Sequence, residues 1–148
     1  MANLNHLADY LGRLDKEIGE KVSKVVQTVA VTITQNVATF TPVDTSNAIS
    51  NWTVQIDSPT NAVIGPHYLG RYGSTYSESL GETIMRAKLA VKSHTRNHAI
   101  YISNNVHYIR KLNAGSSRQQ PAGFVERAVL IGRQKAIDEG AKLKLRKM

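Results

Sequence analysis

The sequence has no cysteine, no long apolar run and few acidic side chains in its second half. The lack of cysteine excludes disulfides and thiolate-based zinc sites. No apolar run approaches the ~20 residues that a membrane-spanning helix needs, and the first residues lack the basic-then-apolar order of a signal peptide. We therefore expect neither a membrane span nor a secretory leader.

The motifs of the common enzyme classes are also missing. There is no glycine-rich phosphate loop with its lysine, no dinucleotide-binding fingerprint and no Gly-x-Ser-x-Gly elbow. His94 and His98 stand four residues apart, but no third ligand follows at the spacing that a zinc site needs. The scattered carboxylates show no pairing that would support acid–base catalysis. We expect a protein that is not an enzyme and that binds no cofactor and no metal.

The chain is long enough for one globular domain with a real core, since it has 148 residues of which 41% are hydrophobic. We assign residues 1–141 to this domain and residues 142–148, which are rich in lysine and arginine, to a basic C-terminal tail. Residues 1–83 contain five Lys/Arg and eight Asp/Glu, and residues 84–148 contain fourteen and three, so these parts carry −3 and +11. This division is typical of a nucleic-acid or acidic neighbour on one side, or of head-to-tail association between like subunits.

The first predicted element is an amphipathic helix from about Asn3 to Thr39. Its apolar residues recur at spacings of three and four, namely Leu4, Leu7, Leu11, Leu14, Ile18, Val22, Val25, Val29 and Ile33. Such a helix would span about 50 Å, so its stripe can belong to the core, to a subunit contact, or to both. The threonine and valine enrichment after Thr28 weakens helix propensity and leaves a break near Thr34 open.

The middle of the chain predicts strands and a contact loop. From Asn47 to Asp57, polar and apolar residues alternate around Trp52, which is typical of a half-buried strand. Residues 61–64 are expected to pair with this strand as a hairpin. The loop that follows, residues 65–77, combines glycine and serine with three tyrosines and would offer an adaptable contact surface, or else lie on its own sheet.

Two more helices and another strand follow. Apolar residues recur with helical spacing over residues 78–92 and again from about Ala122 onward. Between them, residues 99–103 form a β-branched and aromatic run typical of a strand, and residues 108–112 suit one helical turn. Together the elements predict an α+β fold, in which a long N-terminal helix and two further helices pack on a small, mostly antiparallel sheet of three to four strands.

A polar loop, residues 113–122, joins that helical turn to the final helix. Gly115 and Gly123 permit backbone angles that other residues resist, and Pro121 fixes its own φ. A shaped polar loop between two regular elements is a common place for a binding surface.

Nucleic-acid binding is the main alternative from another class. The basic residues of the second half, together with the tail, could form a face for phosphates: Arg110, Lys111, Arg118, Arg127 and Arg133. Against this interpretation, aromatic and basic residues do not interleave as in sheet-based RNA binders, and no helix-turn-helix pattern is present. A solvated basic face fits the composition equally well.

Two stretches together resemble the head–tail joining family of long-tailed bacteriophages, whose members are called neck or tail-completion proteins. The first is Thr41-Pro42-Val43-Asp44-Thr45 before a strand led by Trp52; the family usually continues this turn with glycine, and this chain has Ser46. The second starts at Asn104-Asn105 and contains Tyr108, Leu112, Gly115, Ser117, Gln119, Pro121 and Gly123. The family often has a small residue where Gln120 stands. The resemblance covers most of residues 40–130.

The resemblance implies a structural virion protein without enzymatic activity. Family members have a long N-terminal helix and a small, mostly antiparallel sheet. They assemble as a ring, typically a hexamer, between the portal-connector or head-closure side and the tail terminator or tail tube. Genome DNA passes through the ring without sequence-specific binding, and assembly takes place in the host cytoplasm. A head-to-tail ring needs two different surfaces that meet, and the charge division would suit it if the two parts lie on opposite flanks.

On this basis we expect the polar loop with its flanking glycine (residues 113–123) and the tyrosine loop (residues 68–76) to contact a partner or a neighbouring subunit. The predicted interface residues are Tyr68, Tyr72, Asn105, Tyr108, Arg110, Lys111, Asn113, Gly115, Ser117, Arg118, Gln119, Gln120, Pro121 and Gly123. The predicted structural turn consists of Thr41, Pro42, Val43, Asp44 and Thr45 with Trp52.

Two other interpretations stay open. One is a different ring of the same virion, the tail terminator at the end of the tail tube. The other is a free basic nucleic-acid-binding protein, which predicts DNA affinity in the isolated chain that falls steeply with salt. The ring interpretations predict little affinity from a single subunit.

Overall fold

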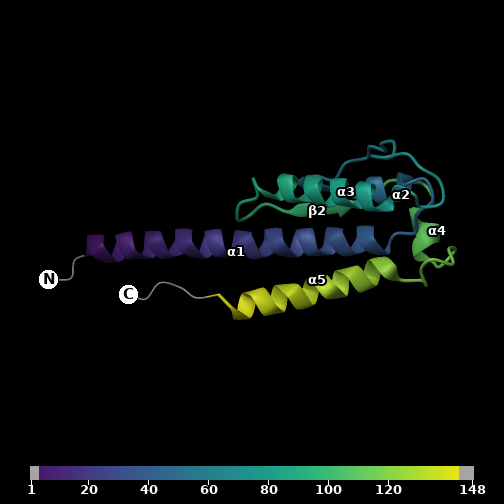
Figure 1. The fold of residues 1–148 in the computed structure, drawn as a ribbon. Helices are drawn as coiled ribbons and strands as arrows, with labels where there is room; N and C mark the ends of the chain where they lie inside the picture. The colour runs from purple at the N-terminus through teal and green to yellow at the C-terminus, as the bar shows by residue number, and fades with distance from the viewer. Residues whose placement is uncertain (1–3, 144–148) are drawn as a thin grey trace.

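A computed structural model describes residues 4–143, and in this range the chain forms five helices and one two-stranded sheet (Figure 1). The long helices are α1 (Leu4–Phe40), α3 (Tyr76–Val91) and α5 (Phe124–Ala141). The short helices are α2 (Asn47–Ser50) and α4 (Ile109–Asn113), and the strands are β1 (Thr53–Ile56) and β2 (Ile100–Ser103). The predicted α+β class with a long N-terminal helix is confirmed.

The fold has α1 in the middle of two layers. Helix α3 and the sheet lie on one side of α1, and α5 runs along the other side (Figure 1). Helix α1 is unbroken, so the interruption that threonine enrichment left open near Thr34 does not occur. The Thr34 side chain is fully buried, and its hydroxyl donates to the carbonyl oxygen of Ala30 at 2.8 Å, so the helix itself satisfies this polar group.

The expected strand count is wrong for the described residues, which form two strands and not three to four. Residues 47–50 form α2 because the Ser46 carbonyl accepts bonds from both the amide (3.2 Å) and the hydroxyl (2.7 Å) of Ser50. β1 pairs with β2, from Thr53 opposite Ser103 to Ile56 opposite Ile100. A local hairpin partner was expected, but the true partner lies about fifty residues away.

Residues 61–64 do not pair with β1, whose partner is β2; the side chain of Asn51 bonds the Ile64 backbone instead. Its Oδ1 accepts from the Ile64 amide at 2.9 Å, and its Nδ2 donates to the Ile64 carbonyl oxygen at 2.9 Å. Asn105 Nδ2 donates to the carbonyl oxygens of Thr60 (2.7 Å) and Ala62 (3.2 Å). The backbone of this segment is therefore held by two asparagine side chains.

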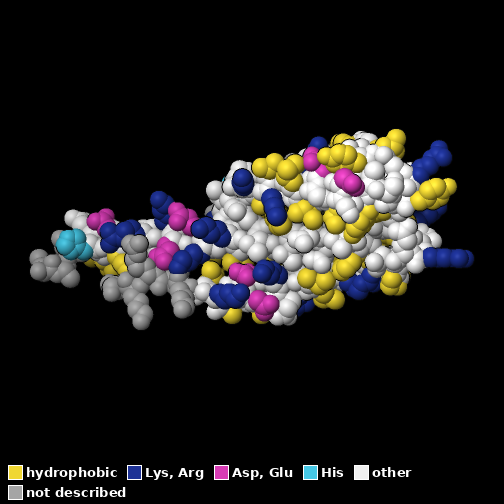
Figure 2. All heavy atoms as spheres, viewed as in Figure 1, with side chains coloured by type: hydrophobic (Ala, Val, Ile, Leu, Met, Phe, Trp, Pro, Cys, Tyr) yellow, Lys and Arg dark blue, Asp and Glu magenta, His cyan; other side chains and the backbone are white. Residues whose placement is uncertain are grey.

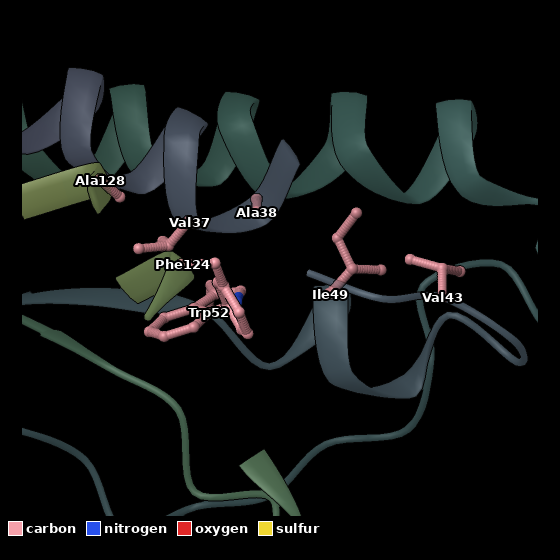
Figure 3. Close-up of a cluster of buried hydrophobic side chains, with 7 residues drawn as sticks. All are labelled: Val37, Ala38, Val43, Ile49, Trp52, Phe124 and Ala128. Atoms are coloured by element: carbon pink, nitrogen blue, oxygen red, sulfur yellow. The ribbon is translucent and has the colours of Figure 1, made fainter. Parts of the chain in front are cut away.

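The larger core cluster joins the start of α5 to the end of α1 and the turn after it (Figure 3). It contains Val37, Ala38, Val43, Ile49, Trp52, Phe124 and Ala128. The Trp52 indole donates to Thr41 Oγ at 2.8 Å, and that hydroxyl donates to the Val37 carbonyl oxygen at 2.6 Å. This relay satisfies the buried indole N–H and ties the turn after α1 to the core.

The first turns of α1 extend past the ends of α3, β2 and α5 (Figure 1) and form a narrow extension of the molecule (Figure 2). Leu4, Leu7 and Leu11 on these turns are 82%, 45% and 52% exposed. The first buried residue of α1 is Gly19. The predicted apolar stripe is thus core in its second half and exposed in its first half. Residues 1–3 and 144–148, including Asn3 and most of the predicted tail, lie outside the described range.

Helices α1 and α5 approach each other closely at Gly132. A β-carbon built on Gly132 would overlap the Cγ1 atom of the Ile33 side chain, whereas one built on Gly140 of the same helix would meet open space. Position 132 therefore requires glycine because of packing and not because of its backbone conformation, which is helical.

We predict that Gly132→Ala lowers the free energy of unfolding by about 1–3 kcal/mol, because the added methyl overpacks the α1–α5 contact. Gly140→Ala is the matched control and should raise it by up to about 1 kcal/mol through helix propensity alone. Urea unfolding measures both. Combining Gly132→Ala with Ile33→Ala should cost less than the sum of the single changes, and strict additivity would contradict this contact.

Candidate functional site

The candidate site is the place where the turn after α1 meets the polar loop. We call the turn (residues 41–47) together with residues 108–123 the turn–loop surface. It lies at the end of the molecule where α4 is drawn, opposite the free end of α1 (Figure 1). A depression of about 300 Å³ lies between the two segments, lined on one side by Val43 and Ser46 and on the other by Tyr108 and Gln119.

Gln119 joins the two segments. Its Oε1 accepts from the Val43 amide at 2.9 Å, and its Nε2 donates to the Val43 carbonyl oxygen at 3.1 Å. Asn47 adds a second link, since its Nδ2 donates to the Tyr108 hydroxyl at 3.1 Å. The two stretches that carry the family resemblance therefore form one surface, although 76 residues separate Val43 from Gln119 along the chain.

The tyrosine loop is fastened to the same turn. Asp44 Oδ1 accepts from the Tyr72 amide at 2.6 Å, and the Asp44 carbonyl oxygen accepts from the Gly73 amide at 2.9 Å. The Tyr72 side chain is 92% exposed and that of Tyr68 is 47% exposed. Two tyrosine rings thus stand in solvent beside the turn, which is an arrangement suited to contact with another protein.

Ser46 occupies a position that favours glycine. Its φ is 68°, in the left-handed region, and its side chain is fully buried. The Ser46 hydroxyl lies 2.8 Å from the Thr75 hydroxyl, and Thr75 donates to the Tyr68 carbonyl oxygen at 2.6 Å. A serine is accommodated here because its small hydroxyl is hydrogen-bonded, and this bond also links the turn to the start of α3.

Asn113 closes the base of the polar loop. Its carbonyl oxygen accepts from the Gly123 amide at 2.7 Å, and its Oδ1 accepts from the Val125 amide at 2.9 Å. Its Nδ2 donates to both carboxylate oxygens of Glu126 at 3.0 Å. The hydrogen bonds from Asn113 are the main reason why the pKa of the Glu126 carboxyl lies below its usual range.

Both predicted glycines of the loop have positive φ, 93° at Gly115 and 84° at Gly123. At Gly115 a β-carbon would also lie 3.2 Å from the Ala122 backbone nitrogen, so the loop ends approach too closely for a side chain. Ser117 Oγ accepts from the Gln119 amide at 3.1 Å and shapes the loop tip. Pro121 is exposed.

Two predicted interface residues, Gln120 and Asn105, serve the fold and not an open surface. Gln120 Oε1 accepts from Arg127 Nη2 at 2.8 Å, and the Arg127 guanidinium lies 5.7 Å from the Phe40 ring centroid. Asn105, as described above, holds residues 60–62. Sequence reasoning missed the parts of Asn47 and Thr75 in the site, because no motif marks a polar residue whose partner is distant.

The exposed cations of the site are unpaired within the described chain. Arg110, Lys111 and Arg118 are exposed and form no ion pair with a described residue. Figure 2 shows basic side chains projecting from this end of the molecule. The two parts of the sequence do not lie on opposite flanks of the molecule, because β1 pairs with β2 and α5 packs along α1.

The two histidines have structural partners. His94 is buried, with Nδ1 2.7 Å from Ser23 Oγ and Nε2 2.8 Å from the His98 carbonyl oxygen. His98 Nδ1 lies 2.8 Å from Asp57 Oδ2. Within residues 4–143 there is no group of three His, Cys, Asp or Glu side chains that could hold a metal ion. None of the described helices has the length and apolar character to cross a membrane.

No protein-family model, curated protein or solved structure matches this chain.

We predict that Gln119→Ala lowers the free energy of unfolding by about 1 kcal/mol and loosens the loop, because the Val43 amide and carbonyl lose their partner. Hydrogen exchange of the Val43 amide should accelerate. Ser116→Ala, at an exposed position of the same loop without a side-chain bond, is the control and should change neither quantity. Unchanged exchange at Val43 in Gln119→Ala would contradict the link.

We also predict an acid-sensitive loop base. The pKa of the Glu126 carboxyl is lowered in the folded protein, so its carboxylate stabilises the loop base at pH values above the ordinary pKa of the group. This stabilisation is lost as pH falls through the lower folded pKa. Hydrogen-exchange protection of residues 113–125 should therefore drop in that acidic range relative to the rest of the protein. Glu126→Gln has no ionisable group there and should lose this pH-dependent part. An identical acid profile in the variant would rule out Glu126 as the cause.

Proposed function

We propose that this protein is a non-enzymatic structural component of a phage virion, forming a ring at the joint between head and tail. The observation that carries the proposal is the Gln119–Val43 amide pair. It draws the two stretches that resemble the head–tail joining family into one surface. A motif whose halves meet in space is a stronger signal than two halves that only follow each other in sequence.

The turn–loop surface is suited to a protein partner. It combines a rigid, hydrogen-bonded base with exposed tyrosine rings and unpaired arginines, and these two residue types dominate the binding energy of protein interfaces. The exposed cations Arg110, Lys111 and Arg118 favour a partner surface that is acidic. In the proposed ring, typically a hexamer, this end of the subunit faces a head connector, head-closure protein, tail terminator or tail tube. The genome passes through the centre, and assembly takes place in the host cytoplasm.

Mass spectrometry of purified virions, with heads and tails separated, tests the location. We expect the protein at a low, ring-sized copy number at the joint or on tails. Its absence from particles, together with abundance in infected-cell lysate, would overturn the proposal. A position at the outer end of the tail tube would favour the tail-terminator alternative.

We predict that reversing the charge of Arg110, Lys111 and Arg118 together to glutamate blocks head–tail joining and lowers infectivity by orders of magnitude. The monomer should keep its thermal stability, because all three side chains are exposed and unpaired. A matched control changes three other exposed cations to glutamate, Lys88, Lys92 and Arg133, and should preserve joining. Complementation of a defective phage measures both, and full infectivity of the first variant would contradict the assigned surface.

The same cations favour a second candidate, nucleic-acid binding, and one measurement separates the two. A free DNA-binding protein would bind duplex DNA as an isolated chain, with affinity that falls steeply as salt rises. The ring proposal predicts that a single subunit binds duplex DNA weakly. It also predicts the loss of infectivity described above for the charge-reversed variant.

A further inference from the structure

The free end of α1 carries an apolar face that nothing in the described chain covers. We call residues 4–18 the arm. Leu4, Leu7 and Leu11 share one helical face and are all exposed. No described residue packs against these three leucines in a core cluster. A leucine stripe on a projecting helix is characteristic of a segment that packs on another surface.

An apolar groove runs beside the middle of the same helix. It is formed by Val25, Val29 and Ile33 of α1, by Ile100 and Ile102 of β2, and by Ala136 of α5. Its volume is about 270 Å³, and its walls are almost wholly apolar. We call this the α1 groove. Its dimensions suit the apolar side chains of a helix face.

The arm cannot fill the α1 groove of its own chain. Both belong to one unbroken helix, in which Leu11 and Val25 are separated by about 21 Å at 1.5 Å per residue. The occupant must therefore come from another molecule. We propose that the arm of one subunit packs into the α1 groove of a neighbouring copy. This deepens the proposed function, since it names the contact between ring subunits.

Charge complementarity favours a second copy as the occupant. The arm carries three acidic and two basic side chains, a net of −1, whereas residues 19–143 carry eight acidic and fourteen basic ones, a net of +6. A depression that shares Val25 with the α1 groove is lined by three cations and one anion, namely Lys21, Lys24, Lys142 and Glu139. The arm, which is net negative, would thus meet a margin that is net positive beside an apolar groove.

The area of the contact suits a closed ring. Half the surface of a helix of this length and about 10 Å diameter is roughly 350 Å², so one contact covers about 700 Å² in total. That is below the ~1,200 Å² of a stable protein–protein interface. In a ring each subunit gives one arm and receives one, because the arm and the groove are different surfaces. The contact is therefore weak in a pair and is reinforced when the ring closes.

Disulfide trapping tests the contact cleanly, because the natural chain has no cysteine. Leu11→Cys and Val29→Cys are purified separately as full-length chains, mixed at high concentration and oxidised. We expect a mixed dimer between the two variants at several times the yield of the control mixture, Leu11→Cys with Met85→Cys. Met85 is on α3 and is 49% exposed.

Two results would overturn the contact. One is a mixed-dimer yield no higher than that of the control. The other is efficient dimerisation of Leu11→Cys alone, which would mean that arms pair with arms. Replacing Leu4 and Leu7 by serine in the Leu11→Cys chain should abolish the mixed dimer without unfolding the protein, since both side chains are exposed. Leu89→Ser, at another exposed leucine, is the matched control for these replacements.

The two proposals fail separately. A mixed dimer from a protein that is absent from virions would support the arm contact and remove the neck function. A protein located at the head–tail joint without the mixed dimer would keep the neck function and assign its subunit contact to other surfaces.

Discussion

The structure depends on the burial of the second half of α1 between two layers. A two-stranded sheet is not stable in water by itself, and here it is stabilised by packing with α3 against that helix. On the other side, α5 approaches α1 closely enough to require glycine at position 132. Every large element is therefore positioned by its packing on α1. The turn that follows α1 is fixed by the Trp52–Thr41–Val37 hydrogen-bond relay.

Side-chain amides and carboxylates form hydrogen bonds with backbone groups that the small sheet does not pair. The side chains of Asn51 and Gln119 bond both the amide and the carbonyl of one residue each, Ile64 and Val43 respectively. The Asp44 carboxylate accepts a hydrogen bond from the Tyr72 amide. Each side chain supplies the pairing that a neighbouring strand would otherwise provide. Long irregular segments are thereby held in defined shapes, and the turn–loop surface is a product of this device and not of regular secondary structure.

The two proposed contact surfaces lie at opposite ends of an elongated subunit (Figure 1). The arm at one end is leucine-rich with a net charge of −1, and the turn–loop surface at the other end is polar, aromatic and basic. In the proposed ring, a subunit would have separate surfaces for its neighbour and for its partner. Partner binding and ring closure would then reinforce each other, since the arm contact alone covers too little area for a stable pair.

The sequence by itself determined the three long helices, the α+β class and the positions of the loop glycines, because helical periodicity and backbone sterics are local properties. Helix α1, for example, begins and ends within about a residue of its predicted bounds. Tertiary structure alone decided the partner of β1, the α2 helix at Asn47 and the exposure of the first leucines. It also decided that Gln119 meets Val43 while Gln120 turns inward to Arg127. These outcomes depend on contacts between residues far apart in the chain, and the local periodicity of the sequence does not encode such contacts.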